Sequence, residues 1–385
     1  MIAGGPLAAP PTNACAPGFT GGASRSWRGL RLAGARGALD GAERPAHPSP
    51  MTARPSRPTL SARRAAGPAL AAALLALGGP GASAQDAPSL ALPVDCVLGE
   101  TCFVQNYVDR DPGPGFADVA CGALGYDGHD GTDFALPDLA AMAAGVEARA
   151  SAPGVVIGTR DGMPDVSFRD PGAPSVAGRE CGNGVHVDHG GGWSTQYCHL
   201  ARGSVAVRPG DRVETGDTLG RIGLSGQTEF PHVHLSVRRQ GETVDPFDAT
   251  GEACGDGALD PLWADPLAYV PTGVIGLAFL DRVPEWDEVT AGGSAFEGAR
   301  DAPLVLWGHA FGGRPGDAMR LRIDGPDGPV MEAAPTLSKT QAAYFFAEGR
   351  HAPEGGWPPG RYTGVGEIRR DGAAVDRAET TLTIR

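Results

Sequence analysis

Lysine is almost absent from this chain of 385 residues, in which Lys339 is the only one. Arginine accounts for the rest of the 32 Lys and Arg residues. Aromatic residues make up only 6%. The sequence has no CxxC spacing, which argues against a structural zinc knuckle and against a thioredoxin-like site. Residues 1–84 carry nine Arg against two acidic residues, whereas the remainder has a strong acidic excess. Because phosphate binding draws on clustered positive charge, we expect no nucleic-acid partner.

Long apolar runs are also lacking, so we do not expect an integral membrane protein. The stretch AAGPALAAALLALGG is too short and too interrupted by Gly and Pro to span a bilayer. It follows a basic segment that starts at Met51 and precedes the small residues Ala82-Ser83-Ala84, which is the layout of a secretory signal. We interpret 51–84 as a signal peptide cleaved before Gln85. We interpret 1–50 as a misassigned start or a disordered extension.

What the sequence has in abundance is glycine and proline, with 59 Gly and 35 Pro. This composition favours many short strands joined by tight turns, and alternating runs crowd between residues 145 and 240. We predict a mainly β protein in which an antiparallel β-sheet domain is followed by a small β-sandwich. The predicted segments are a disulfide-stapled lead-in at 85–125, the sheet domain at 126–265 and the sandwich at 273–385.

Export changes the interpretation of the cysteines. An even six follow the signal, and in an oxidising compartment they are expected to form disulfides. Pivoting the hairpin about Gly190–Gly192 places Cys181 near Cys198, so we predict that these two pair. The pairing of Cys96, Cys102, Cys121 and Cys254 is left open.

Histidines are concentrated in the sheet domain, where six of the nine lie between His129 and His234. This density favours a metal site. The first cluster is HDGTD, in which His129 and Asp133 would lie about 13 Å apart on a straight strand at roughly 3.3 Å per residue. Both can reach one ion only if the chain bends between them, and Asp130-Gly131 is a turn dipeptide suited to that bend.

The second cluster is PHVHLSV. The strand period of two places His232 and His234 on one face and Val233 and Leu235 on the other. A further histidine, His199, ends the predicted hairpin strand. One carboxylate and two imidazoles leave a coordination position open for water, which is the pattern of catalytic rather than structural zinc. From the pattern alone, either imidazole of the HxH could be the ligand.

The motifs HDGTD, GNGVHVDHGGGWSTQYCHL, VRPGDRVETGDTLGRIGLSG and PHVHLSV, in this order and spacing, resemble the lysostaphin/LytM-type zinc endopeptidases that cut peptidoglycan peptides. The resemblance covers about residues 125–247. It implies a zinc ion held by His129, Asp133 and His234, with His199 and His232 as catalytic partners. All five are present, so the resemblance implies an active member. The cysteine framework and the loop at 161–180 depart from the family and bear on substrate preference.

The resemblance therefore implies a zinc-dependent endopeptidase that hydrolyses peptide bonds in peptidoglycan stem peptides or cross-links during cell-wall remodelling. Together with the signal and the Arg-dominated composition, it implies export across the inner membrane to the periplasm or cell envelope of a Gram-negative bacterium, with cross-links ending in D-Ala as the target. The sandwich domain has no residue cluster suited to catalysis, so targeting, autoinhibition and a regulatory protein partner are all open roles for it.

Three other hypotheses each fit part of the sequence. His186 and Asp188 form an HxD that resembles part of an iron(II) oxygenase site, but export to an oxidising compartment argues against it. We interpret these two residues and His189 as structural or groove-lining. A lipoyl or biotinyl carrier needs a lysine at its hairpin tip, and Lys339 lies elsewhere. The remaining alternative is a non-catalytic cell-wall binding module or an activator of another hydrolase, which zinc content would distinguish from an enzyme.

Overall fold

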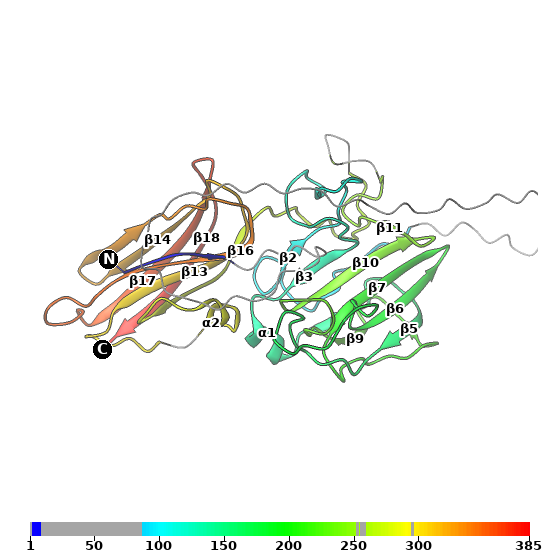
Figure 1. Ribbon diagram of the computed structural model, residues 1–385, viewed down its shortest axis with the longest axis horizontal. Coiled ribbons are helices and arrows are strands. Elements are labelled where there is room, and N and C mark those ends of the chain that lie inside the picture. Colours follow the sequence, from blue (N-terminus) through cyan, green and yellow to red (C-terminus); the bar gives the residue numbers. More distant parts are fainter. Residues whose placement is uncertain (1, 9–86, 252–253, 255–258, 294–295) are drawn as a thin grey trace, which may run out of the picture. The chain divides into compact units, whose positions relative to one another are not determined.

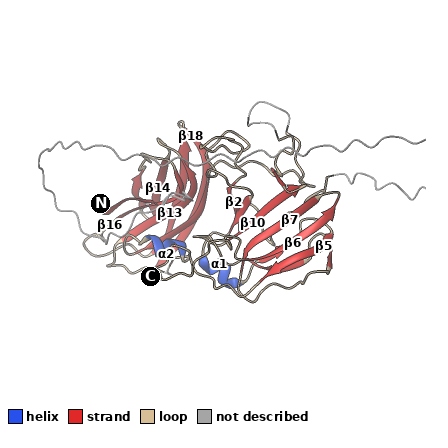
Figure 2. Cartoon of the chain, turned by 45° about the vertical axis from the view of Figure 1, so that its right-hand side comes forward, coloured by secondary structure: helices blue, strands red, loops and turns tan. Residues whose placement is uncertain are grey.

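The computed structural model describes residues 2–8, 87–251, 254, 259–293 and 296–385. Its architecture is dominated by antiparallel strands (Figure 1 and Figure 2), which confirms the predicted fold class. The described part contains two short helices, α1 (Leu139–Ala144) and α2 (Trp286–Thr290). Within it, no helix has the length and apolar character needed to cross a membrane. The predicted signal peptide and its cleavage point before Gln85 lie outside the described residues.

The larger sheet of the first domain has eight strands, all paired antiparallel. They are β2 (Phe103–Asn106), β3 (Thr132–Ala135), β5 (Gly154–Arg160), β6 (Asn183–Gly190), β7 (Trp193–Leu200), β8 (Arg212–Val213), β10 (His232–Arg239) and β11 (Glu242–Val244). Their order is β2-β3-β10-β7-β6-β5-β8, and β11 pairs with β10 at its other end. Two further strands, β4 (Glu147–Arg149) and β9 (Thr218–Arg221), form a separate pair.

The hairpin of β6 and β7 turns where three consecutive glycines were predicted to turn it. Gly190, Gly191 and Gly192 all have positive φ angles, of 80°, 60° and 84°. Residues other than glycine rarely adopt positive φ angles, so the glycine run fixes the position of the turn. On its other edge β7 pairs with β10, and there His234 lies opposite Cys198.

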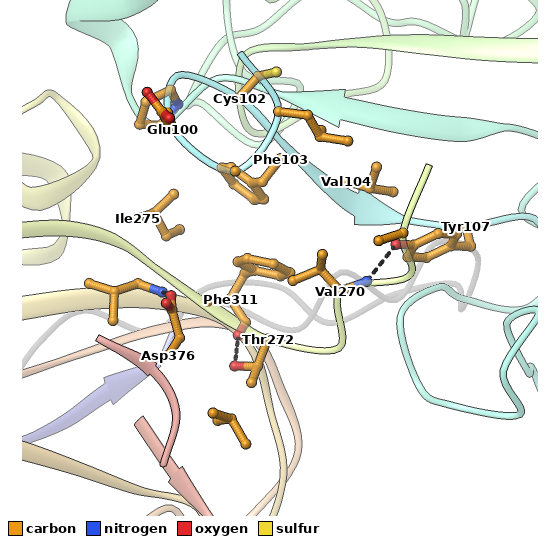
Figure 3. A pocket seen from close by; sticks show the side chains of 17 residues that line it. Glu100, Cys102, Phe103, Val104, Tyr107, Val270, Thr272, Ile275, Phe311 and Asp376 are labelled. Atoms are coloured by element: carbon orange, nitrogen blue, oxygen red, sulfur yellow. Dashed lines mark hydrogen bonds between the residues drawn. The ribbon is translucent and has the colours of Figure 1, made fainter. Parts of the chain in front are cut away.

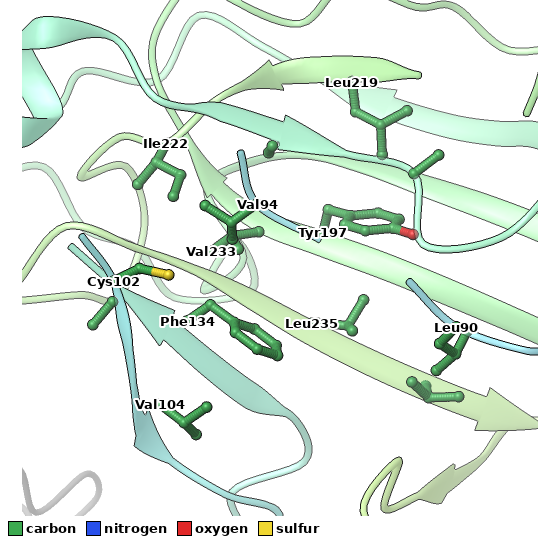
Figure 4. Close-up of a cluster of buried hydrophobic side chains, with 14 of the residues drawn as sticks. Leu90, Val94, Cys102, Val104, Phe134, Tyr197, Leu219, Ile222, Val233 and Leu235 are labelled. Atoms are coloured by element: carbon green, nitrogen blue, oxygen red, sulfur yellow. The ribbon is translucent and has the colours of Figure 1, made fainter. Parts of the chain in front are cut away.

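Alternation along β10 separates the core from the polar face. Val233, Leu235 and Val237 are buried in an apolar cluster that includes Phe134 of β3 and Tyr197 of β7. Figure 4 shows Val233 and Leu235 in this cluster together with Phe134 and Tyr197. Because successive side chains of a strand point to opposite faces, the histidines of β10 are directed to the other side.

The lead-in at 85–125 is part of this sheet rather than an appendage. Its strand β2 pairs with β3, and its cysteines form the disulfides Cys96–Cys102 and Cys121–Cys254. A cavity of about 190 Å³ lies beside β2, where the rings of Phe103 and Phe311 stack with centroids 4.7 Å apart (Figure 3). Apolar side chains such as Phe103, Ile275 and Phe311 supply much of its lining.

The second domain has two four-stranded sheets. One has the order β1-β16-β13-β12, formed by β1 (Ile2–Ala8), β16 (Gln341–Arg350), β13 (Leu304–Gly313) and β12 (Gly273–Leu280). The strand β1 belongs to the segment 1–50 that we interpreted as a misassigned start or a disordered extension, and its pairing with β16 departs from that interpretation for residues 2–8. The other has the order β15-β14-β17-β18, formed by β15 (Gly328–Ala333), β14 (Ala318–Gly325), β17 (Gly360–Arg370) and β18 (Ala373–Ile384). Leu306 and Tyr344 of the first sheet share a buried cluster with Leu321 and Tyr362 of the second, as expected for a sandwich.

Candidate metal centre and its cleft

Three donor side chains converge on the polar side of β3 and β10. His129 precedes β3, Asp133 lies on β3, and His234 lies directly opposite Asp133 on β10. Asp133 Oδ1 is 3.2 Å from His129 Nε2 and 2.9 Å from His234 Nδ1, and the two ring nitrogens are 3.2 Å apart. One ligand atom from each residue lies within 4.8 Å of the others, and all three residues are buried. This arrangement is able to hold a metal ion.

The predicted bend at Asp130-Gly131 is what allows HDGTD to close on one point. A Cβ atom at Gly131 would lie 2.7 Å from the carbonyl oxygen of Leu235, a distance that real side chains do not tolerate. Only glycine therefore lets the chain pass close to the backbone and ring of His234 on the neighbouring strand.

Each donor has a second partner that fixes its orientation. His129 Nδ1 lies 2.6 Å from the carbonyl oxygen of Tyr107, so it donates its hydrogen there and leaves Nε2 for the cluster. Asn106 donates to Asp133 Oδ2 at 2.8 Å. On the far side of His234, Nε2 is 3.0 Å from Ser236 Oγ and 3.3 Å from Asp130 Oδ1. Such outer contacts set the tautomer and the direction of the inner groups.

Two more imidazoles border the cluster. His232 Nε2 is 3.3 Å from Asp133 Oδ1, while its Nδ1 is 3.0 Å from the carbonyl oxygen of Phe230. His199 donates from Nδ1 to the carbonyl oxygen of Ser225 at 2.7 Å. The ring centroids of His199 and His232 are 4.6 Å apart. The structure thus brings together all five residues that the sequence singled out.

His199 is held in an unusual backbone conformation, with a φ angle of 63°. A non-glycine residue in this left-handed region carries strain that the surrounding structure must offset. Its N–H donates to the carbonyl oxygen of Cys181 at 2.8 Å, and its carbonyl oxygen accepts from the N–H of Gly223 at 2.9 Å. These bonds turn the ring of His199 away from the sheet ladder and toward His232.

The electrostatics of the cluster favour a cation. Burial alone would raise the pKa of Asp133, but His129 and His232 hold this pKa well below its usual range. Burial alone would lower the pKa of His234, but Asp130 and Asp133 raise it to about 9. Two ionised carboxylates therefore create a negative field at His234, and the same field stabilises a divalent ion. Burial, followed by His232 and His234, holds the pKa of His199 well below its usual range, so that ring is neutral at pH 7.

The cluster opens into a cleft made of two hollows of about 200 Å³ and 50 Å³, which share Tyr126, His199 and Gln227. The loop at 161–180 lines both of them. Phe168 and Arg169 border the smaller hollow, and Glu180 borders the larger one. The loop is anchored by its backbone, since the Phe168 N–H donates to the carbonyl oxygen of Thr228 at 3.2 Å, and by a side chain, since Asp165 Oδ1 accepts the N–H of Leu224 at 2.8 Å.

The HxD of β6 does not join the donor cluster. His189 bridges the carbonyl oxygen of Pro153 at 2.7 Å and the hydroxyl of Thr195 at 2.8 Å, which is a structural link between segments. His186 lies opposite Gln196 on β7, and its buried Nε2 has no hydrogen-bond partner in the described part of the chain.

The predicted disulfide between Cys181 and Cys198 is confirmed, with Cα atoms 4.7 Å apart. Cys198 directly precedes His199, and the carbonyl oxygen of Cys181 accepts the His199 N–H. The disulfide therefore holds together the residue that precedes His199 and the residue that accepts its N–H.

Replacing Cys181 and Cys198 together by serine should lower the free energy of unfolding by about 3 kcal/mol, because the open chain regains the entropy of a 17-residue loop. Amide hydrogen exchange at His199 should accelerate as well, since its acceptor at Cys181 is released. The matched control is the Cys96→Ser and Cys102→Ser pair, which lies away from His199 and should leave exchange there unchanged. Unaltered exchange at His199 in the first variant would contradict the anchoring role.

Sequence reasoning missed the partners that orient the site. Asn106 and Tyr107 lie in the lead-in, where no periodic pattern marked them, and Asp130 was considered only as a turn residue. The signal available in the sequence was weak. HDGTD contains a second acidic residue, and β2 is a short run, FVQN, in a polar context.

The segment that carries this cluster is also the one that resembles known proteins. Residues 127–246 match the model of Peptidase family M23. Peptidoglycan DD-endopeptidase ShyA of Vibrio cholerae is 31% identical over 121 residues, which are 31% of this chain and 23% of that protein. DD-carboxypeptidase/endopeptidase Mpg of Neisseria meningitidis is 31% identical over 120 residues, 31% of this chain and 22% of that protein. Cell division protein DipM of Caulobacter vibrioides is 35% identical over 88 residues, 22% of this chain and 14% of that protein.

The matched segment spans less than a quarter of the length of each of these curated relatives. It contains the five histidine and aspartate residues of the cluster and the hairpin between them. The resemblance drawn from the sequence motifs is thereby confirmed, and it lies in residues 127–246, the segment that matches peptidase family M23.

Proposed function

We propose that this protein is a zinc-dependent endopeptidase that hydrolyses peptide bonds in peptidoglycan stem peptides or cross-links. The observation that carries the proposal is the convergence of His129, Asp133 and His234 within 4.8 Å, with two further imidazoles at their edge. The relatives named for DD-endopeptidase and DD-carboxypeptidase activity support peptidoglycan as the substrate class.

The donor set suits zinc. Two imidazole nitrogens and one carboxylate oxygen are ligands that zinc accepts, and three protein ligands leave a position open, as in catalytic sites. The direction of His234 supports its choice over His232 as the ligand. Its Nδ1 faces both Asp133 and His129. Of the other donor residues in the cluster, His232 lies within hydrogen-bond range only of Asp133.

When bound, zinc supplies Lewis-acid activation of water and of the scissile carbonyl group. His199 is neutral and commits Nδ1 to the carbonyl oxygen of Ser225, so its Nε2 is left as a proton acceptor. His232 commits Nδ1 to Phe230, which directs its Nε2 toward the same centre. We assign to these two imidazoles the transfer of the water proton and the stabilisation of the developing oxyanion.

The setting of the enzyme is part of the same proposal. Export to the periplasm or cell envelope fits the signal-like sequence at 51–84 and a peptidoglycan substrate. The sandwich over 273–385 is assigned to targeting or to a regulatory protein partner, because its buried His309 stands apart from any donor cluster.

The experiment is digestion of purified peptidoglycan by the zinc-loaded protein, followed by mass analysis of the products. Conversion of cross-linked fragments to uncross-linked ones, with the gain of one water per cut, is the expected result. A chelator-treated sample reloaded with zinc is the control. Retention on intact sacculi with no released or converted fragments would instead support the non-catalytic binding module.

A further inference from the structure

Arg238 stands in the cleft four residues beyond His234. The side chains of His234, Ser236 and Arg238 point to the same side of β10, since strand residues alternate. In the pairing of β10 with β7, Ser236 lies opposite Gln196. Both residues line the larger hollow, as do Cys181 and Cys198. Within the part of the chain that the structure describes, Arg238 is the only Arg or Lys side chain among the residues lining this hollow.

The guanidinium group is fixed in place but not saturated. It donates from Nη2 to Asp130 Oδ2 at 2.7 Å and from Nη1 to Gln196 Oε1 at 3.0 Å. Its side chain retains 21% of its exposure. Arginine has five N–H donors in a rigid fork, so three remain that no hydrogen bond among the described residues uses. A held, partly exposed guanidinium is pre-organised to bind a carboxylate with little further loss of entropy.

Arg238 borders the same hollow as His199 and His234 of the reacting centre. Asp130 spans the gap, with Oδ1 3.3 Å from His234 Nε2 and Oδ2 2.7 Å from Arg238 Nη2. The guanidinium group is thus one carboxylate away from the imidazole proposed to hold zinc. In a peptide, a carboxyl carbon attached to the carbon that bears the scissile nitrogen lies about 3.5 Å from the scissile carbonyl carbon. Because the centre and the guanidinium group line one hollow, a substrate bound at the centre is placed to present that carboxylate to Arg238.

The acidic residues that line this hollow disfavour the binding of a free anion. They do not exclude the carboxylate of a peptide that is already bound at the centre. Asp130 is already paired with Arg238 Nη2 at 2.7 Å and with His234 Nε2 at 3.3 Å. Glu180 is turned to its own loop, where it accepts the N–H of Gly178 at 2.7 Å. A peptide that is anchored at the centre brings its carboxylate to Arg238 at high effective concentration, which a free anion does not.

We propose that Arg238 is a specificity-determining residue that pairs with a free substrate carboxylate adjacent to the scissile amide. This assignment rests on the proposed endopeptidase function and narrows its substrate class. Peptides in which that carboxylate is free are preferred, and peptides in which it is an amide or is missing are poor substrates.

The test compares two synthetic cross-linked peptides that differ only in this group, a carboxylate in one and a carboxamide in the other. The zinc-loaded wild-type protein should cleave the carboxylate substrate with a kcat/KM about 10- to 100-fold higher, the range of a hydrogen bond to a charged group. Arg238→Gln should lose this preference to within about threefold, mainly through KM for the carboxylate substrate. Its zinc content and its rate on the carboxamide should be close to those of the wild type.

The matched control is Arg239→Gln. Arg239 is next in sequence, points to the other side of β10 and lies over the ring of Trp193 at 5.2 Å, so its loss should leave the preference intact. Equal cleavage of the two peptides by the wild type overturns the assignment and leaves the proposed function standing. A uniform loss on both peptides with loss of zinc in Arg238→Gln also overturns it, because Arg238 would then act only by holding Asp130. Cleavage of neither peptide by the wild type overturns the proposed function and the assignment together.

Discussion

Alanine in place of His129, Asp133 or His234 should remove bound zinc and, with it, the hydrolysis of peptidoglycan. Each variant deletes one of three donors that the protein supplies, and the two that remain hold the ion far less tightly. Loss of an outer partner of a metal ligand typically costs about 10- to 100-fold in metal affinity or activity, so loss of a ligand itself should cost more. The measurement is zinc per chain by elemental analysis, taken beside the rate of peptidoglycan turnover.

A graded series sharpens this prediction. Asn106→Ala removes the amide that donates to Asp133 Oδ2 at 2.8 Å, and should weaken zinc binding by about 10- to 100-fold without abolishing it. His186→Gln changes a histidine of the same domain that lies outside the cluster, and should retain a full equivalent of zinc. If the three ligand variants keep one zinc per chain, the assigned donor set is wrong. Full activity in all three would remove the basis for the metalloenzyme itself.

The individual motifs of this site follow from local sequence patterns, because each motif involves residues close in the chain, whereas their convergence on one centre was implied by the resemblance to the lysostaphin/LytM-type endopeptidases. Strand alternation alone places His232 and His234 on the face opposite Val233 and Leu235, and the structure agrees. The glycine run after β6 fixes the hairpin register, and from that register the Cys181–Cys198 pair follows.

What escaped prediction depends on contacts between distant segments. Asn106 reaches Asp133 only because β2 pairs with β3 across 27 positions of sequence, and no periodicity in FVQN indicates that pairing. The pairing of β15 with β14 likewise has no local signal, since GPVMEA has too few alternating apolar positions to stand out from a turn. The need for glycine at 131 arises from Leu235 on another strand. In each case the deciding neighbour lies far away in the sequence.

His199→Ala and His232→Ala should behave differently from the ligand variants, keeping zinc close to one per chain while losing about 10²- to 10⁴-fold in rate. The reason is geometric. Neither residue belongs to the set of donor atoms within 4.8 Å, and each has Nδ1 committed to a backbone carbonyl oxygen, that of Ser225 or of Phe230. Their remaining nitrogens can accept or donate a proton beside the centre without holding the ion.

The decisive comparison lies within the HxH, because His232 and His234 share one face of β10 and both approach Asp133 Oδ1, at 3.3 Å and 2.9 Å. Zinc content separates them where activity cannot, since both alanine variants should be nearly inactive. The asymmetry rests on His234 alone, whose Nδ1 lies 3.2 Å from His129 Nε2 and whose Nε2 is backed by Ser236 and Asp130. If His232→Ala loses its metal while His234→Ala keeps it, the two roles are reversed, and the outer contacts of His234 then serve to orient a proton-transfer group instead of a ligand.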